Sequence, residues 1–165
     1  MINEHIIEPS STDKIRFSDC DPFGHLNNSK YFDYMMNARE TQLHEVYGFS
    51  LEDFYKQGTG WVITSHQIFY LSPAKFNEQV SIGTTLLAYT DSTLKVECVM
   101  SSQASSKIKA VLWTELACVN LATGKKQAHP REVFAFAEKV LNKRVDPSEG
   151  IAKRIQFLTQ KPIES

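Results

Sequence analysis

Residues 19–48 read DCDPFGHLNNSKYFDYMMNARETQLHEVYG, and this stretch decides the fold. Its first part holds a proline, a glycine and paired asparagines, which disfavour regular structure and indicate a loop. The loop ends where Asn28 or Ser29 can cap a helix, because a short side-chain oxygen accepts the free amide hydrogens of a first helical turn. A helical wheel over residues 30–47, at about 100° per residue, gathers the apolar residues on one broad side. They are Tyr31, Phe32, Met35, Met36, Ala38, Leu43, Val46 and Tyr47. So wide an arc predicts a helix packed deeply against a sheet, and Gly48 predicts its end.

Arg39 falls at the centre of this apolar arc, between Met35 and Val46. An unpaired guanidinium in such surroundings would be costly. We therefore expect Arg39 to be largely buried and held by acceptors. Two sources of acceptors stay open: a carboxylate or backbone carbonyls at a subunit contact, or a bound substrate.

Beyond the helix the sequence changes to a period-2 pattern, rich in β-branched and aromatic residues. Counting a short run before the loop, strands are expected at residues 15–19, 61–71, 80–88, 94–100 and 108–118. Short links between successive strands make them antiparallel neighbours. A second, shorter helix is expected at 130–141, with Pro130 at its first position. The pattern predicts an α+β fold in which a curled antiparallel sheet wraps one long helix.

The bulk composition limits the function classes. A chain of 165 residues with 42% hydrophobic content predicts one domain over residues 1–165, with its core at about 13–135 and a C-terminal helix and tail at 130–165. A net charge of -1 without a concentrated basic stripe argues against nucleic acid as a partner.

Compartment and metal content are predicted from the termini and the cysteines. Residues 1–9, MINEHIIEP, lack the regions of a signal peptide, and no later run reaches membrane-spanning length. Cys20, Cys98 and Cys118 are odd in number and share no CxxC spacing, which argues against a disulfide framework or a zinc site. We expect a reduced, cytoplasmic protein without a metal, a cofactor or a membrane partner.

Two segments resemble a known family. The run DCDPFGH at 19–25, followed by LNNSKY at 26–31, resembles the active-site loop and helix start of hotdog-fold thioesterases of the 4-hydroxybenzoyl-CoA thioesterase type. YLSPA at 70–74, with Asn77 and Glu78, resembles the turn into their next strand. The resemblance spans about residues 13–135. It implies a hotdog fold, hydrolysis of an acyl-CoA thioester, and a homodimer or homotetramer.

The segment HLNNSKY is also similar to plant acyl-ACP thioesterases, in which an aspartate likewise lies four residues before the histidine. Those enzymes carry an asparagine between the two, where this chain has Phe23. This departure leaves an aspartate-centred mechanism.

Thioester hydrolysis needs a group that activates water or attacks the carbonyl, and a donor for the developing oxyanion. An aspartate carboxylate is ordinarily ionised at neutral pH, so Asp21 can act as general base or as nucleophile, and the sequence does not decide between them. The resemblance places the oxyanion hole on the backbone amide of Asn28, where helix N–H groups and the dipole point back at the loop.

Each of these residues also has a structural reading. Asp21 could be an Asx-turn residue that stabilises the loop. His25 could orient substrate or water, or hydrogen-bond the loop to a strand. Asp19 can be read as a second carboxylate of the site, and a loop-capping role is the favoured interpretation. Cys20 is read as an unreactive thiol, because two neighbouring anions would raise its pKa.

Substrate-binding residues are assigned at both ends of an acyl-CoA. The CoA phosphates call for cations at the mouth of the site, and Lys107 and Lys109 share a strand face while Lys75 lies in the SPAKF turn. Ordinary solvated lysines are the alternative reading. The apolar acyl end would lie along the helix and the sheet, where Tyr31, Phe32 and Met35 offer a wall, although core packing explains these residues equally well. Gly24 and Asn27 complete the substrate-binding residues, and Asn27 also has a structural reading.

Two other functions compete with acyl-CoA hydrolysis. Acyl-ACP thioesterase activity would want a basic docking patch for an acidic carrier, and the lysines here are scattered. A non-catalytic acyl-CoA binding module is the alternative from another class, because a fold does not guarantee an activity. Asp21 in an intact loop argues for the enzyme.

Overall fold

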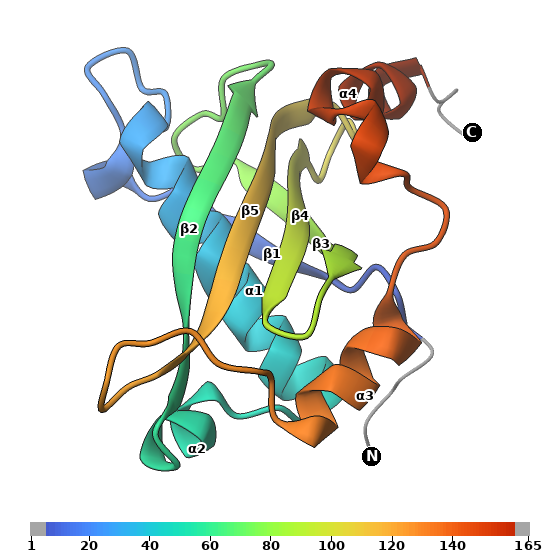
Figure 1. The fold of residues 1–165 in the computed structure, drawn as a ribbon. Coiled ribbons are helices and arrows are strands. Elements are labelled where there is room, and N and C mark those ends of the chain that lie inside the picture. The colour runs from blue at the N-terminus through green and yellow to red at the C-terminus, as the bar shows by residue number, and fades with distance from the viewer. Residues whose placement is uncertain (1–5, 161–165) are drawn as a thin grey trace.

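Five antiparallel strands form one curled sheet in the computed structural model, which describes residues 6–160 (Figure 1). The strands are β1 (Ser10–Lys14), β2 (Thr59–Tyr70), β3 (Gln79–Tyr89), β4 (Thr93–Ser102) and β5 (Ile108–Asn120). Their order in the sheet is β1-β3-β4-β5-β2. The two edges are therefore β1, which is short, and β2, which is long.

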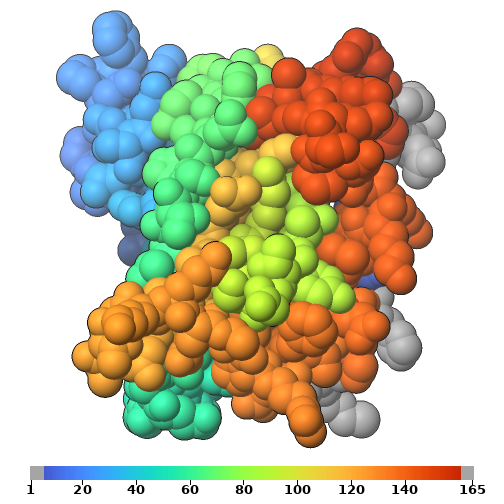
Figure 2. Space-filling model, in the orientation of Figure 1, coloured from blue at the N-terminus to red at the C-terminus, as the bar shows by residue number. Residues whose placement is uncertain are grey.

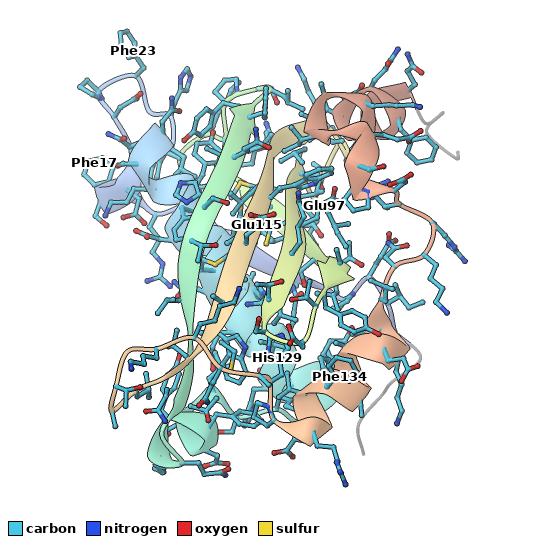
Figure 3. The ribbon with its side chains drawn as sticks, viewed as in Figure 1. Phe17, Phe23, Glu97, Glu115, His129 and Phe134 are labelled. Carbon is cyan, nitrogen blue, oxygen red and sulfur yellow. The ribbon has the colours of Figure 1, made fainter. Side chains whose placement is uncertain are left out.

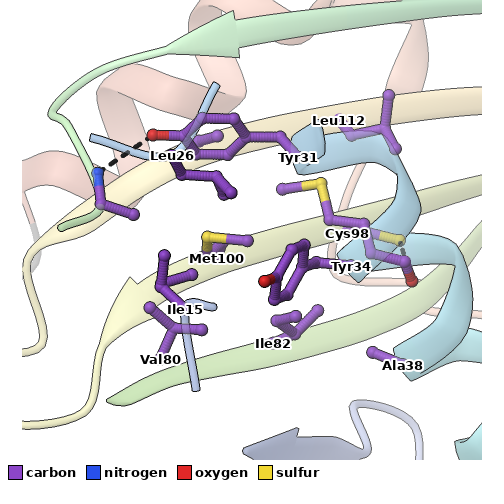
Figure 4. Packing of buried hydrophobic residues seen from close by; sticks show 13 residues of the cluster. Ile15, Leu26, Tyr31, Tyr34, Ala38, Val80, Ile82, Cys98, Met100 and Leu112 are labelled. Atoms are coloured by element: carbon purple, nitrogen blue, oxygen red, sulfur yellow. Dashed lines mark hydrogen bonds between the residues drawn. The ribbon is translucent and has the colours of Figure 1, made fainter. Parts of the chain in front are cut away.

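The long helix α1 (Tyr31–Tyr47) packs against one face of this sheet, as the sequence predicts (Figure 1). Figure 4 shows its side chains Tyr31, Tyr34 and Ala38 meeting strand residues such as Ile82 and Met100 in the main core cluster. The helix ends at Gly48, whose φ of 72° is the left-handed conformation that glycine adopts readily. The α+β arrangement of one helix against a curled sheet is confirmed.

The rotation of α1 differs from the predicted wheel. Its buried positions include Tyr34 and Gln42, neither of which belongs to the apolar arc. Gln42 is tolerated in the core because its amide donates to Ser11 Oγ and to the Ile82 carbonyl, each at 2.9 Å. The stripe that contacts the sheet most closely runs through Ala38 and Gln42 rather than through Arg39.

Arg39 consequently lies on the flank of the buried stripe, and its side chain lines a cavity. It is half-buried. Within residues 6–160 its guanidinium makes no hydrogen bond or ion pair, so the acceptors expected for it are not found in the described part of the chain. Arg39 is therefore partly rather than largely buried, and no acceptor for its guanidinium lies within residues 6–160.

The β strands agree closely with the predicted ranges, except for the first. Residues 17–19 form a 3-10 turn, and β1 lies earlier, at Ser10–Lys14. That edge strand has the polar sequence SSTDK, so no apolar periodicity predicts it. Ile15 is apolar and therefore suggests a strand in the sequence. In the structure it follows the last residue of β1 and is buried in the core.

Three further helices surround the sheet. The short α2 (Leu51–Lys56) and α3 (Arg131–Val140) lie near the C-terminal end of α1, and α4 (Ile151–Gln160) covers the opposite face of the sheet (Figure 1). Under α4 a second cluster contains Leu87, Val111 and Trp113. In Figure 2 the surface of β4, in yellow-green, is visible between α4 in red and α3 in orange. Of these helices only α3 is predicted from the sequence.

Two predictions concern residues that partly lie outside the described range of 6–160. The first five residues of the segment that argues against a signal peptide, and residues 161–165 of the predicted tail, lie outside the described range. No helix within residues 6–160 is long and apolar enough to cross a membrane.

Candidate active site

The loop before α1 is built around the carboxylate of Asp21. Its Oδ1 accepts the backbone N–H of Phe23 at 2.9 Å and that of His25 at 3.1 Å, which is the Asx-turn arrangement. Asp21 N–H donates to the His25 carbonyl, and Gly24 N–H donates to the Asp21 carbonyl. Gly24 has a φ of 73°, which allows the tight return of the chain. The structural reading of Asp21 is therefore present, and it uses only one carboxylate oxygen. Within residues 6–160 Oδ2 has no hydrogen-bond donor.

A second contact fixes this loop to the turn between β2 and β3. Leu26 N–H donates to the Ala74 carbonyl and Phe76 N–H to the Gly24 carbonyl, each at 2.8 Å. Phe23 stands at the tip of the loop and points away from the protein (Figure 3), with 84% of its surface exposed. The loop is held at its base and exposes its tip.

The helix start differs from the prediction in its cap. Asn27, not Asn28 or Ser29, is the capping residue: its Oδ1 accepts from Ser29 N–H at 3.0 Å and from Ser29 Oγ at 2.9 Å. A 3-10 turn, Asn28–Lys30, follows and leads into α1. Asn28 N–H has no acceptor in the described range, whereas its carbonyl accepts from Tyr70 Oη at 2.9 Å. A free N–H at the first position of a helical turn is the geometry that an oxyanion hole uses.

These groups surround a small pocket of about 270 Å³. Its wall is formed by Asp21, His25, Leu26, Asn28, Tyr31, Tyr70, Leu71, Ser72 and Pro73. The structure thus brings together the three predicted catalytic residues Asp21, His25 and Asn28. The pocket also includes Tyr70 and Ser72, which received no role from the sequence although they lie in the YLSPA segment that carries the resemblance.

Tyr31 contributes to this pocket as a buried wall. Its hydroxyl accepts the Ala74 N–H at 3.0 Å, and its ring makes an edge contact with Tyr70 at a centroid distance of 5.1 Å. Burial is the largest cause of a raised Tyr31 pKa, which keeps the hydroxyl protonated.

The neighbouring Asp19 and Cys20 have structural environments. Asp19 Oδ2 accepts from Tyr34 Oη at 2.7 Å, and burial together with this bond raises the pKa of Tyr34 to about 12. Cys20 Sγ donates to the Arg16 carbonyl. The pKa of its thiol is raised first by desolvation and then by the charges of Asp19 and Asp21, so the predicted direction is right and its leading cause is different.

The lysines assigned to the CoA phosphates are not alike. Lys75 is exposed, and its backbone bridges to His25 beside the pocket. Lys107 is exposed in the loop before β5. Lys109 is buried at 6% exposure, and its Nζ lies 3.0 Å from Glu78 Oε2 and 3.0 Å from the Pro73 carbonyl. Lys107 lies before β5 begins, so the period-2 argument for a common face does not apply to it, and Lys109 is buried in an ion pair with Glu78.

Comparison with known proteins places this loop and fold in a family. The model of the thioesterase-like superfamily matches residues 15–151, which include the whole loop and all of the sheet except β1. The chain belongs to the thioesterase-like superfamily. Membership of this superfamily supports thioester hydrolysis as the general activity. No curated protein sequence matches the chain significantly.

Solved structures agree on the fold. A 1,4-dihydroxy-2-naphthoyl-CoA thioesterase from Synechocystis has a TM-score of 0.73 at 16% identity, over 84% of this chain and 99% of that one. A DHNA-CoA thioesterase from Staphylococcus aureus gives 0.73 at 19% identity, over 96% and 98%. A hypothetical protein from the same organism, solved in complex with CoA, gives 0.76 at 12% identity, over 100% and 98%. This member of the superfamily therefore has the predicted hotdog fold.

Proposed function

We propose that this superfamily member hydrolyses an acyl-CoA thioester to a free acid and CoA, with Asp21 as the reacting carboxylate and the Asn28 N–H as an oxyanion donor. The observation that carries the proposal is that the two oxygens of the Asp21 carboxylate have different environments. Oδ1 is held by two backbone N–H groups, and Oδ2 is left without a donor in the described range. The carboxylate is thereby fixed in orientation with one oxygen available for chemistry.

The reaction balances with water as the second substrate. In the general-base route Oδ2 takes a proton from water while the water oxygen attacks the thioester carbonyl. In the nucleophilic route Oδ2 attacks the carbonyl and water then hydrolyses the resulting anhydride. In both routes the carbonyl oxygen gains negative charge beside the Asn28 N–H, and the carbon–sulfur bond breaks to release CoA thiol.

Recognition of CoA is supported by the relative that was solved in complex with CoA. Lys75 is the cation best placed to meet its phosphates, because its backbone is paired with His25 at the edge of the pocket. Lys107 is a further exposed candidate. The Lys109 charge is already neutralised by Glu78, so we leave it out of the phosphate contact.

Self-association through β2 completes the proposal. This edge strand of 12 residues exposes apolar side chains that include Val62, Ile63, Phe69 and Tyr70. Long exposed edges are templates for pairing with another strand. Tyr70 also lines the small pocket, so pairing of two β2 strands would put the pocket beside the subunit contact. Light scattering should give at least twice the 18.8 kDa of one chain at micromolar concentration. A mass of one chain would contradict the shared contact.

The experiment that tests the function is a hydrolysis screen over aromatic, short-chain and long-chain acyl-CoAs with free thiol detected. The proposal expects release of thiol from at least one class above the uncatalysed rate. Binding of acyl-CoA without release of thiol from any class would favour the binding module instead.

A further inference from the structure

A second cavity, of about 370 Å³, lies along α1 and shares no lining residue with the Asp21 pocket. Its wall draws on α1, α2, α3 and the sheet, with side chains such as Leu43, Phe54, Val96 and Phe136. This volume lies within the range of small-molecule sites in proteins. The cavity is predominantly apolar, which favours an apolar ligand.

Most polar groups in this wall are already used by the fold. The Gln42 amide donates to Ser11 and Ile82, and its Oε1 accepts from Thr84 Oγ1 at 2.5 Å. Thr85 Oγ1 donates to the Ile7 carbonyl at 2.9 Å. These side chains already form hydrogen bonds within the protein, so they do not indicate a polar ligand.

Arg39 is the exception. Within residues 6–160 its guanidinium has no hydrogen-bond acceptor and no ion-pair partner, although it lines the cavity. Desolvation lowers its pKa, and the nearby Cys98 and Tyr55 offset this only in part. Glu40 is the carboxylate that shares the wall, and it is exposed and forms no ion pair with Arg39. Arg39 is partly buried, so its unpaired charge loses part of its hydration to the apolar wall, and a carboxylate ligand would pair that charge.

The dimensions and the charge together specify a ligand class. A water molecule in the liquid occupies about 30 Å³, so the cavity has room for roughly ten to twelve non-hydrogen atoms. Arginine presents a planar fork of donors that matches a carboxylate. We propose that this cavity binds a carboxylate on an apolar chain of about eight to ten carbons, with the carboxylate paired to Arg39. A free fatty acid and the distal carboxylate of a dicarboxylic acyl-CoA share this chemistry.

Calorimetric titration of the full chain with decanoate and with decan-1-ol tests the pairing, because the two ligands share a chain and differ in charge. Loss of a hydrogen bond to a charged group lowers the affinity of a ligand by about ten- to hundredfold. We expect wild type to prefer decanoate by at least about tenfold, and Arg39→Met to reduce the preference below about threefold. Arg144→Met, at an exposed arginine outside the cavity wall, is the matched control and should keep the wild-type preference. Equal binding of the two ligands by wild type, or an unchanged preference in Arg39→Met, would overturn the proposal.

Thermal melting without ligand gives an independent readout. If the guanidinium is unpaired, Arg39→Met replaces a desolvated charge with an apolar side chain and should melt at the same temperature as wild type or higher. A lower melting temperature, or loss of self-association, would mean that a second copy of the chain supplies the acceptor. Either result would refute the ligand site.

Two further arms separate the sources of the carboxylate. Asp21→Asn should bind decanoate as wild type does, since binding does not depend on hydrolysis, and a failure of the proposed function would leave this arm intact. The other arm rests on the proposed function and compares hydrolysis of decanoyl-CoA with that of its analogue bearing a second, distal carboxylate. A loss by Arg39→Met on the dicarboxylic substrate alone assigns the site to the substrate tail. Unchanged rates on both, with decanoate binding lost, assign it to a free acid.

Discussion

Removal of the Arg154 guanidinium should detach α4 from the sheet. Arg154 donates from Nε and Nη2 to the Glu97 carboxylate, with N–O distances of 2.9 to 3.2 Å. Glu97 is 2% exposed, and its Oε2 also accepts from Trp113 Nε1 at 2.8 Å. Figure 3 shows Glu97 within the sheet, close to the α4 side of the molecule. Arg154→Met therefore leaves a buried carboxylate with one neutral donor.

The magnitude follows from the burial of the pair. Breaking a buried ion pair by removing one partner costs about 3 to 5 kcal/mol. For a chain of this size each kcal/mol lowers the melting temperature by about 2 to 4 °C, so a fall of about 6 to 20 °C is expected. The double variant Glu97→Gln/Arg154→Met should recover at least half of the loss, because the uncompensated charge is gone and Gln still accepts from Trp113.

The assay is thermal melting by calorimetry, together with hydrogen exchange of the α4 amides. Lys153→Met is the matched control, because it breaks the exposed pair of Lys153 with Glu149 one residue away and should cost about 0 to 1 kcal/mol. Equal shifts for Arg154→Met and Lys153→Met would refute the reasoning. So would a double variant that melts lower than Arg154→Met alone.

Two smaller predictions concern the helix cap and the response to pH. Asn27→Ala removes the acceptor of Ser29 N–H and should cost about 1 kcal/mol in urea unfolding, while Asn27→Ser should keep most of the stability; equal losses would contradict the cap. His129 accepts from Trp61 Nε1 at Nδ1, and burial, outweighing its bond to the Thr93 carbonyl and the charge of Asp91, holds its pKa below the ordinary value. Unfolding then takes up a proton, so stability should be full above about pH 6.5 and decrease as the pH falls through the lowered pKa. His129→Gln should flatten this decrease in urea midpoints between pH 5 and 7.5, and an unaltered slope would contradict the assignment.

The long helix and the four long strands could be predicted because their apolar periodicities are strong. The polar strand β1 and the short α2 carry no such periodicity. The position of α4 depends on its packing against the opposite face of the sheet, which the sequence pattern does not define. The wheel for α1 centres on Arg39 and leaves Tyr34 and Gln42 out of the apolar arc, although hydrogen bonds allow both to be buried.

The candidate site was predictable in its residues and less so in their atoms. The spacing of Asp21, His25 and Asn28 put them in one loop, but the division of the Asp21 carboxylate between an Asx turn and a free oxygen needs coordinates. Tyr70 and Lys109 show the limit most clearly, because their environments depend on partners distant in sequence, Asn28 and Glu78.

The turnover of Asp21→Asn with an acyl-CoA that the wild type hydrolyses tests the central claim most directly. The asparagine Oδ1 can still accept from Phe23 and His25, so the loop should keep its geometry and the melting temperature should stay close to that of wild type. Loss of the reactive oxygen should lower kcat by about 10² to 10⁴. Asp19→Asn, which changes the neighbouring carboxylate that holds Tyr34, should retain most of the activity. If folded Asp21→Asn kept more than about a third of the wild-type kcat, Asp21 would not be the reacting carboxylate.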